Sequence, residues 1–218
     1  MWSFIILNIV RPIVKLIFKL MFKLEAKGLE NIPAKGAVVI TPNHVSYIDP
    51  VLVGALITRR IYFMTWDEML KIPVLGSIGR LFGAYPIKLE GHDRFAVKLT
   101  QAHLKAGRAV GIFPEGGRTT SKKLDPFKPG AFRLSLRGGV PIVPVTINGA
   151  YDVWPPGQKY PKLTGKITIY FHPPIYLPDV SGAELKEYIP GIIEKVRQSI
   201  ISTLEEKLIP DDAKVRSV

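Results

Sequence analysis

A histidine and an aspartate five positions apart offer the first chemistry in this chain. His44 and Asp49 follow an apolar run at 37–41. A glycine and a proline flank this run, and the pattern predicts a buried strand. In open α/β sheets, ligands bind outside the carboxyl ends of the strands, so we expect both side chains at such an end. If Asp49 folds back onto one imidazole nitrogen, the other nitrogen can serve as a base near neutral pH. Otherwise Asp49 only caps the helix that begins near Pro50.

A second loop carries groups that suit an anion. Residues 109–113 predict another buried strand, and the positions after it include Glu115, Gly116, Gly117 and Arg118. Two glycines let backbone N–H groups approach an anion closely, and the planar guanidinium of arginine matches phosphate. If the two strands are parallel neighbours, both loops open into one crevice, which would hold a base beside a phosphate site. On its own, this loop also fits a glycine turn with a surface ion pair.

Apolar runs of strand and helix type alternate along the rest of the chain. We expect further strands at 60–65, 83–89, 141–147 and 166–171, and helices at 50–58, 67–81 and 92–106. A capping box of Ser181 and Glu184 predicts a last helix, bent or split at 190–191. This alternation predicts an α/β fold with a mixed, largely parallel sheet flanked by helices. We expect one domain at 25–209, an N-terminal helical segment at 1–24 and a loose tail at 210–218.

Residues 1–24 combine apolar and cationic side chains in a pattern typical of a membrane surface. The side chains expected to contact the membrane are Arg11, Lys15, Lys19, Lys23, Phe18 and Phe22. A broad apolar face with a narrow cationic edge favours amphipathic helices lying in an anionic bilayer surface, here two helices with a break near Pro12. A transmembrane helix is disfavoured because each central cation costs about 2.5–3.5 kcal/mol. A spanning helix and an ordinary core-packing helix stay open as alternatives.

The composition narrows the choice of partners. Thirty basic and eighteen acidic residues give a net charge of +12, which implies an anionic partner such as anionic membrane lipids or a phosphorylated substrate. No nucleic-acid motif or exposed aromatic platform accompanies that charge, so no nucleic acid is expected. The absence of cysteine excludes a thiolate metal site and a cysteine acyl-enzyme. No metal is expected, since no cluster of acidic or histidine residues has the spacing of metal ligands. His92, His103 and His172 are expected to lie at the surface or to take part in packing.

Three motifs in order resemble those of the glycerolipid acyltransferases. Asn43-His44 through Asp49 is similar to their NHxxxxD motif, and residues 113–118 resemble FPEGTR. Residues 140–145 resemble VPIVPV and contain Pro141 and Pro144. The resemblance covers about residues 25–175 and is closest to the bacterial 1-acyl-glycerol-3-phosphate acyltransferases, also called lysophosphatidic acid acyltransferases.

The chain departs from this family's pattern at positions that bind phosphate. Gly117 replaces the threonine of FPEGTR, and Trp66 stands where members commonly carry lysine. Lys88 and Leu89 stand where members often carry Asp-Arg. Lys88 or Arg94 is therefore expected to replace the missing arginine.

The resemblance implies transfer of an acyl group from acyl-CoA or acyl-carrier protein to the free sn-2 hydroxyl of lysophosphatidic acid, which makes phosphatidic acid without a cofactor. It implies that His44 is the general base, that Asp49 orients it, and that Arg118 with the glycine backbone holds the phosphate. Glu115 would bond the substrate or brace its loop. Ser46 is a candidate for an acyl-enzyme, although direct transfer is simpler. The implied location is the cytoplasmic face of the cell membrane, peripheral or monotopic.

Other functions stay open at this point. An enzyme of the same fold could acylate glycerol 3-phosphate or a lyso-aminolipid instead. A protein of another class could bind membranes without catalysis. A hydrolase is disfavoured because the chain has no GxSxG motif.

Overall fold

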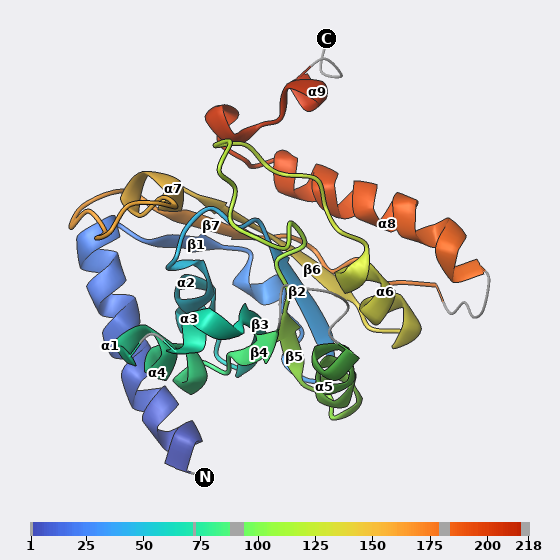
Figure 1. Cartoon of the computed structure of the whole chain (residues 1–218), viewed down its shortest axis with the longest axis horizontal. Coiled ribbons are helices and arrows are strands. Elements are labelled where there is room, and N and C mark those ends of the chain that lie inside the picture. Colours follow the sequence, from blue (N-terminus) through green and yellow to red (C-terminus); the bar gives the residue numbers. More distant parts are fainter. Residues whose placement is uncertain (1, 72, 88–93, 179–183, 215–218) are drawn as a thin grey trace.

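A seven-stranded sheet forms the centre of the protein (Figure 1). The structure, a computed structural model, describes residues 2–71, 73–87, 94–178 and 184–214. The strand order is β1-β7-β6-β2-β5-β3-β4, and every neighbouring pair is parallel except the antiparallel β6 and β7. The predicted mixed, largely parallel sheet is thus confirmed. The strands are β1 (Glu25–Lys27), β2 (Val38–Pro42), β3 (Ile61–Trp66), β4 (Tyr85–Ile87), β5 (Ala109–Gly111), β6 (Ile142–Asn148) and β7 (Thr168–Phe171).

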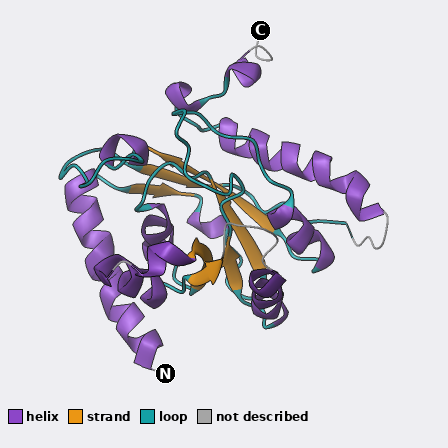
Figure 2. Cartoon of the chain, in the orientation of Figure 1, coloured by secondary structure: helices purple, strands orange, loops and turns teal. Residues whose placement is uncertain are grey.

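Helices flank the sheet on both sides (Figures 1 and 2). Helices α1 to α4 lie on one side of the strands, and α5, α6 and α8 lie on the other, where α6 packs against both α5 and α8. The helices are α1 (Trp2–Phe22), α2 (Asp49–Leu56), α3 (Asp67–Lys71), α4 (Pro73–Leu81), α5 (Arg94–Lys105), α6 (Gly130–Arg137), α7 (Ala150–Val153), α8 (Glu184–Ile201) and α9 (Asp211–Lys214). Two 3₁₀ turns, η1 (Leu29–Asn31) and η2 (Glu206–Leu208), complete the described elements.

The central strands β2 and β6 are buried along their whole length. Continuous β-branched and apolar runs of this kind are typical of parallel strands that helices cover on both faces. On one side of β2, Ile40 pairs with Val143 of β6, and on the other side it pairs with Gly111 of β5. The strands at 37–41 and 109–113 are therefore parallel neighbours, which was the condition for their loops to open into one crevice. Their carboxyl ends, with the loops that follow, lie side by side.

Helix α1 is a single helix, so the predicted break near Pro12 is wrong. Proline lacks a backbone N–H and crowds the preceding turn, which was the reason to expect a break. Instead α1 packs against α2 and ends with Phe22 in the hydrophobic core, and this packing offsets the cost of the proline. Helix α8 likewise continues through Pro190, so of the two expectations there, a bend or a split, the split is excluded. Ser181 of the expected capping box lies outside the described residues.

Two of the side chains predicted to contact a membrane are turned inward. Phe22 is only 2% exposed, and Arg11 is buried, where its guanidinium donates hydrogen bonds to the carbonyl oxygens of Thr58 and Arg59. The prediction is wrong for both residues, because the face of α1 that carries them packs on the body of the protein. Phe18 is half-buried against the same core.

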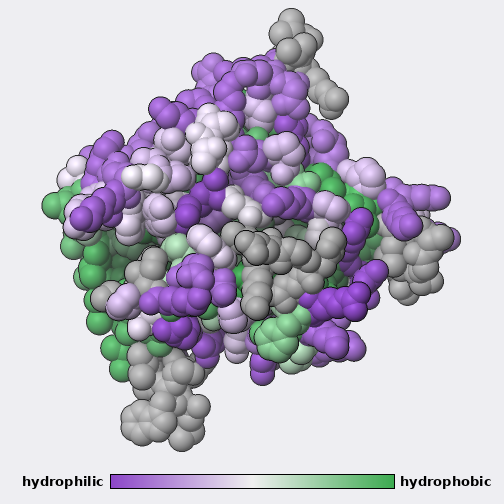
Figure 3. Space-filling view, viewed as in Figure 1, coloured by the Kyte–Doolittle hydropathy of each residue, from purple (hydrophilic) through white to green (hydrophobic). Residues whose placement is uncertain are grey.

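The opposite face of α1 is exposed and apolar. Lys15, Lys19 and Lys23, which are also predicted to contact a membrane, are exposed. Among the described side chains of this helix, several large apolar ones face outward. We call them the α1 stripe: Ile9, Ile13, Leu16, Ile17 and Leu20. Their spacing of three and four places them on one side of the helix. Figure 3 shows hydrophobic surface gathered along the left edge of the molecule, over α1. Within the described ranges, no helix combines the length and the apolar character needed to cross a membrane.

The start of the C-terminal tail is attached to the body rather than loose. Asp211 to Lys214 form α9, and ion pairs join Lys123 to Asp211 and Arg197 to Asp212. The prediction of a loose tail at 210–218 is therefore wrong for residues 211–214. Residues 215–218 lie outside the described part of the chain.

Candidate active site

The loop after β2 folds back so that Asp49 meets His44. The Asp49 Oδ2 atom accepts a hydrogen bond from His44 Nδ1 at 2.9 Å, and from the backbone N–H groups of Val45 at 2.8 Å and Ser46 at 2.7 Å. No side chain caps the first turn of α2, which follows Ile48, so Asp49 does not act as its cap. The carboxylate is fully buried, whereas the imidazole is 15% exposed. A carboxylate on Nδ1–H leaves Nε2 as the acceptor nitrogen, which is what a general base requires.

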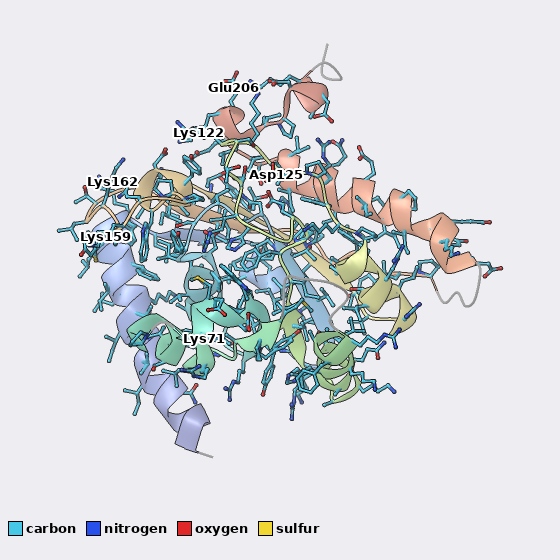
Figure 4. All side chains as sticks on the ribbon, in the orientation of Figure 1. Lys71, Lys122, Asp125, Lys159, Lys162 and Glu206 are labelled. Carbon is cyan, nitrogen blue, oxygen red and sulfur yellow. The ribbon has the colours of Figure 1, made fainter. Side chains whose placement is uncertain are left out.

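The loop after β5 holds the backbone of His44 on both sides. Glu115 Oε1 accepts a hydrogen bond from His44 N at 2.6 Å, and Thr119 N donates to the carbonyl oxygen of His44 at 3.0 Å. The second carboxyl oxygen of Glu115 accepts from Asp125 N at 2.9 Å, and Asp125 is labelled in Figure 4. Glu115 is itself buried. Of its two expected roles, bracing the loop is the one that these contacts support.

The imidazole ring is also held from its face. It stacks on Phe113, with ring centroids 3.9 Å apart and planes inclined by 20°, and Phe113 in turn stacks on Phe63 at 5.8 Å. Gly111 makes room for this layer, since a Cβ atom at that position would lie 2.2 Å from the Phe63 ring. A ring fixed by stacking, by a carboxylate and by its own backbone is preorganised for proton transfer.

Asn43, Pro141 and Pro144 lie in the sheet framework beneath the site. The side chain of Asn43 accepts a hydrogen bond from Ile147 N at 2.7 Å and donates to Ile147 O at 3.1 Å, so it prolongs the pairing of β2 with β6. The carbonyl oxygens of Pro141 and Pro144 accept from Val39 N and His172 N, each at 3.0 Å. These contacts fix where the loop after β2 begins.

The two loops open into one cavity of about 260 Å³. His44 and the Gly116-Gly117-Arg118 segment line its polar part. The remaining wall is largely apolar. It comes from the loop after β2 and the start of α2, from the ends of β3 and β4, from α3, and from the residues directly after β5: Tyr47, Pro50, Met64, Thr65, Trp66, Met69, Ile87, Ile112 and Phe113. The His44 imidazole, the Arg118 guanidinium and an apolar wall thus share one crevice at the carboxyl ends of the strands.

Arg118 is half-buried in this cavity and stacks on Tyr47. Its guanidinium carbon lies 3.8 Å from the centre of the Tyr47 ring, and its Nη1 atom lies 4.0 Å from Met69 Sδ. Burial lowers the pKa of Arg118, while the nearby Tyr47 and Asp49 oppose that shift. The guanidinium stays charged at neutral pH, because an ordinary arginine pKa lies far above it.

Of the two cations expected to replace the missing arginine, only Arg94 lies in the described part of the chain, and it is not brought into the cavity. Lys88 lies outside the described residues. Arg94 is exposed at the start of α5 and is not among the described residues that line the cavity. Lys128, which the sequence analysis missed, lies against the glycine loop, since a Cβ atom at Gly116 would stand 2.6 Å from its Nζ. Gly116 has a φ of +74°, which already favours glycine.

Other candidate side chains are engaged in packing. The Ser46 hydroxyl is buried and donates a hydrogen bond to Trp154 O at 2.8 Å, which argues against an acyl-enzyme on it. His103 is buried and stacks on Tyr62 at 4.0 Å, and His172 Nε2 lies 2.8 Å from Thr146 Oγ1, as expected for packing residues. His92 lies outside the described residues. In the described part of the chain, no group of three or more acidic or histidine side chains could hold a metal ion.

The buried carboxyl of Glu115 leads to a pH prediction. Burial raises its pKa to about 8, against the opposing effect of its two backbone N–H donors. Since the folded-state pKa is the higher one, the stability linked to this carboxyl is full in acid and is lost as pH rises from the ordinary carboxyl range to about 8. Relative to a Glu115→Gln protein, the wild type should lose free energy of unfolding between about pH 5 and about pH 8. Urea denaturation of both proteins at each pH measures this, and a difference that does not change with pH would contradict it.

Comparison with known proteins shows the family to which the chain belongs. Residues 23–148, more than half of the chain, match the family model described as Acyltransferase. The chain therefore belongs to the Acyltransferase family. The family resemblance read from the three motifs is thereby confirmed.

Named relatives and a solved structure add detail. The chain is 32% identical over 155 residues to the chloroplastic 1-acyl-sn-glycerol-3-phosphate acyltransferase BAT2 of Brassica napus, covering 70% of this chain and 45% of that protein. It is 29% identical over 180 residues to the 1-acyl-sn-glycerol-3-phosphate acyltransferase of Bacillus subtilis, and the match covers 82% of this chain and 86% of that protein. The crystal structure of the 1-acyl-sn-glycerophosphate (LPA) acyltransferase PlsC from Thermotoga maritima matches with a TM-score of 0.70 and 26% identity, over 88% of this chain and 78% of that one.

Proposed function

We propose that this protein transfers an acyl group from an acyl thioester to the free sn-2 hydroxyl of lysophosphatidic acid and so makes phosphatidic acid. The observation that carries the proposal is that the His44–Asp49 pair and Arg118 meet at one cavity with an apolar wall. The names of the relatives from Brassica and Bacillus support the choice of acceptor.

The proposed reaction is a direct transfer with His44 as general base. His44 Nε2 takes the proton of the acceptor hydroxyl while the hydroxyl oxygen bonds to the thioester carbonyl carbon. Asp49, on Nδ1, stabilises the imidazolium that forms. When the tetrahedral intermediate collapses, the carbon–sulfur bond breaks, and the departing thiolate takes the proton back from His44. General-base help of this kind contributes about 10²- to 10⁴-fold to the rate.

Arg118 and the backbone of Gly116 and Gly117 are proposed to bind the acceptor's phosphate. Arginine can donate two parallel hydrogen bonds to phosphate, and both glycines are exposed to the cavity. Lys128, against Gly116, supplies a further positive charge beside the loop. Glu115 is proposed to brace this loop and not to bind substrate, since both its oxygens already accept backbone hydrogen bonds.

The donor is proposed to be acyl-CoA or acyl-carrier protein, both of which present the same thioester to the base. The apolar wall at Met64, Trp66, Met69 and Ile87 offers a surface for an acyl chain. No cofactor is needed for this chemistry, because the thioester is itself activated.

The α1 stripe is proposed to rest on the cytoplasmic face of the cell membrane, in a peripheral or monotopic manner. Its apolar side chains have no partner among the described residues that would cover them, and Leu20 is 74% exposed. Lys15 and Lys19 flank the stripe and would attract anionic lipids. A lysophospholipid acceptor lies in that same membrane, so docking would bring the cavity to its substrate.

A Leu20→Glu protein should bind membranes at least about tenfold more weakly than the wild type, because burying one leucine contributes about 1.5–3 kcal/mol. Co-sedimentation with vesicles that contain phosphatidylglycerol measures the partition. Phe95→Glu is the matched control, since Phe95 is 68% exposed but lies on α5, on the other side of the sheet from α1. Equal binding by the wild type and Leu20→Glu would contradict a docking role for the stripe.

The proposed reaction is tested by offering purified protein three acceptors in mixed micelles. The acceptors are lysophosphatidic acid, glycerol 3-phosphate and a lyso-aminolipid, each with an acyl-CoA and with an acyl-carrier protein thioester. We expect phosphatidic acid from lysophosphatidic acid, identified by its mass, and no comparable product from the others. Transfer to one of the other acceptors alone would overturn the assigned substrate, and no transfer from either donor would overturn the reaction.

A further inference from the structure

Three side chains from three different loops lie against one another beside the cavity, in a row that we call the stack, and two of them, Tyr47 and Arg118, line the cavity. Tyr47 follows β2, Arg118 follows β5, and Trp154 follows β6 at the end of α7. The Trp154 and Tyr47 ring centroids are 5.2 Å apart with planes inclined by 43°, and the guanidinium of Arg118 lies 3.8 Å from the Tyr47 ring centre. Tyr47 is therefore the middle member of the stack, with an aromatic ring and a cation as its neighbours.

The aromatic half of the stack is anchored to the backbone around it. The indole Nε1 of Trp154 donates to Gln158 O at 2.9 Å, and Trp154 O accepts from the Ser46 hydroxyl at 2.8 Å. Ser46 is buried and directly precedes Tyr47. The Ser46–Trp154 hydrogen bond thus joins the loop that carries Tyr47 to the loop that carries Trp154, and this fixes the two rings relative to each other.

Arg118 has few other contacts that hold its guanidinium. Among the described residues, its Nε has no hydrogen-bond partner, and no carboxylate lies within ion-pair distance of it. Its Nη1 reaches only the weak acceptor Met69 Sδ at 4.0 Å. The N–H groups of Arg118 are therefore available to an anion in the cavity, while the Tyr47 ring supports the face of the guanidinium.

We propose that Tyr47 is a positioning residue that holds the guanidinium of Arg118 in place for the phosphate of the acceptor, with Trp154 as its backing. This inference rests on the proposed function, in which Arg118 binds that phosphate. An arginine side chain loses much conformational freedom when it is fixed on a ligand. Stacking that fixes it beforehand lowers this cost, so the acceptor binds more tightly.

The π face of Tyr47, and not its hydroxyl, carries the role. No hydrogen bond joins the Tyr47 hydroxyl to the described residues, whereas the ring contacts both Arg118 and Trp154. Phenylalanine keeps the ring and leucine removes it. The two substitutions therefore separate the stacking contact from other effects of changing this residue.

The test compares kcat and KM of the wild type, Tyr47→Phe and Tyr47→Leu. Tyr47→Leu should raise KM for lysophosphatidic acid about tenfold and leave kcat within about twofold, while Tyr47→Phe stays close to the wild type. With a monoacylglycerol acceptor, which has no phosphate, Tyr47→Leu should raise KM by much less than it does with lysophosphatidic acid. The matched control is Tyr160→Leu, because Tyr160 also has a lysine over its ring, Lys159 at 5.3 Å, but is exposed and does not line the cavity (Lys159 is labelled in Figure 4).

A double-mutant cycle with Arg118→Gln shows whether Tyr47 acts through Arg118. In the Arg118→Gln background, Tyr47→Leu should cause no further rise in KM. An equal rise in both backgrounds, or an unchanged KM in Tyr47→Leu, would overturn the inference. If Tyr47→Leu does not fold, Tyr47→Met is used in its place. A wild type that acylates the monoacylglycerol but not lysophosphatidic acid would instead overturn the proposed acceptor, before any variant is compared.

Discussion

Acyl transfer by an Asp49→Ala protein is expected to fall about 10³- to 10⁴-fold, and that by Asp49→Asn about 10²-fold. Asp49 Oδ2 accepts three hydrogen bonds, from His44 Nδ1 and from the N–H groups of Val45 and Ser46. In Asp49→Asn, the two backbone donors favour the amide oxygen at this position, so the imidazole keeps its tautomer and only the negative charge is lost. In Asp49→Ala the orientation is lost as well.

Steady-state kinetics with lysophosphatidic acid measure both effects, and kcat should fall far more than KM rises. Asp152→Asn is the control, since Asp152 is an exposed carboxylate that pairs with Lys207 away from the cavity. A fully active Asp49→Asn protein would show that the charge on this carboxylate plays no part in the reaction. Equal activities of the two Asp49 variants would show that orientation plays none.

Removing the Glu115 carboxyl is expected to cost both stability and activity. In Glu115→Ala, the backbone N–H groups of His44 and Asp125 lose their acceptor inside the protein. Each unsatisfied donor costs about 1–3 kcal/mol, so the free energy of unfolding should fall by about 2–6 kcal/mol. The rate of acyl transfer should fall about 10- to 100-fold, because a loosened His44 backbone misplaces the imidazole.

The Glu115 prediction is checked by urea denaturation and by kcat with lysophosphatidic acid. Glu115→Gln is the matched variant, because one of its side-chain atoms can still accept a backbone hydrogen bond. It should lose less stability than Glu115→Ala. Wild-type stability and activity in Glu115→Ala would mean that this carboxyl does not brace the loop.

Much of the fold could be predicted because its central strands are unusually apolar. The runs that became β2, β5 and β6 contain little but β-branched and apolar residues, and their burial on both faces follows from that pattern. The short strand β1 and helix α6 were missed. β1 has only the residues Glu-Ala-Lys, so its pairing with β7 comes from tertiary contacts rather than from its own sequence.

The orientation of α1 could not be read from its sequence. Apolar residues lie on several sides of this helix, so its sequence alone left open which face the body would cover. Packing against the body selected the face that carries Arg11 and Phe22. Arg11 is accommodated there because the carbonyl oxygens of Thr58 and Arg59, far along the chain, accept its hydrogen bonds. A periodic pattern of charge cannot reveal such partners.

In the candidate site, too, some contacts could be predicted from the sequence and others could not. The contact of His44 with Asp49 was predictable because the two residues share one short loop. Other contacts join separate loops or distant positions: Phe113 stacks on His44, Arg118 stacks on Tyr47, and the Lys128 side chain lies against Gly116. Phe113 lay within a recognised motif, but nothing in the sequence showed that its ring meets the imidazole.

The central claim is that His44 serves as the base for acylation of lysophosphatidic acid. The most direct test is the initial rate of phosphatidic acid formation by the wild type and by His44→Ala, in the same mixed micelles and with saturating donor and acceptor. We expect phosphatidic acid from the wild type and a loss of about 10²- to 10⁴-fold in His44→Ala, with vesicle binding unchanged. Equal rates of phosphatidic acid formation by the two proteins would contradict it.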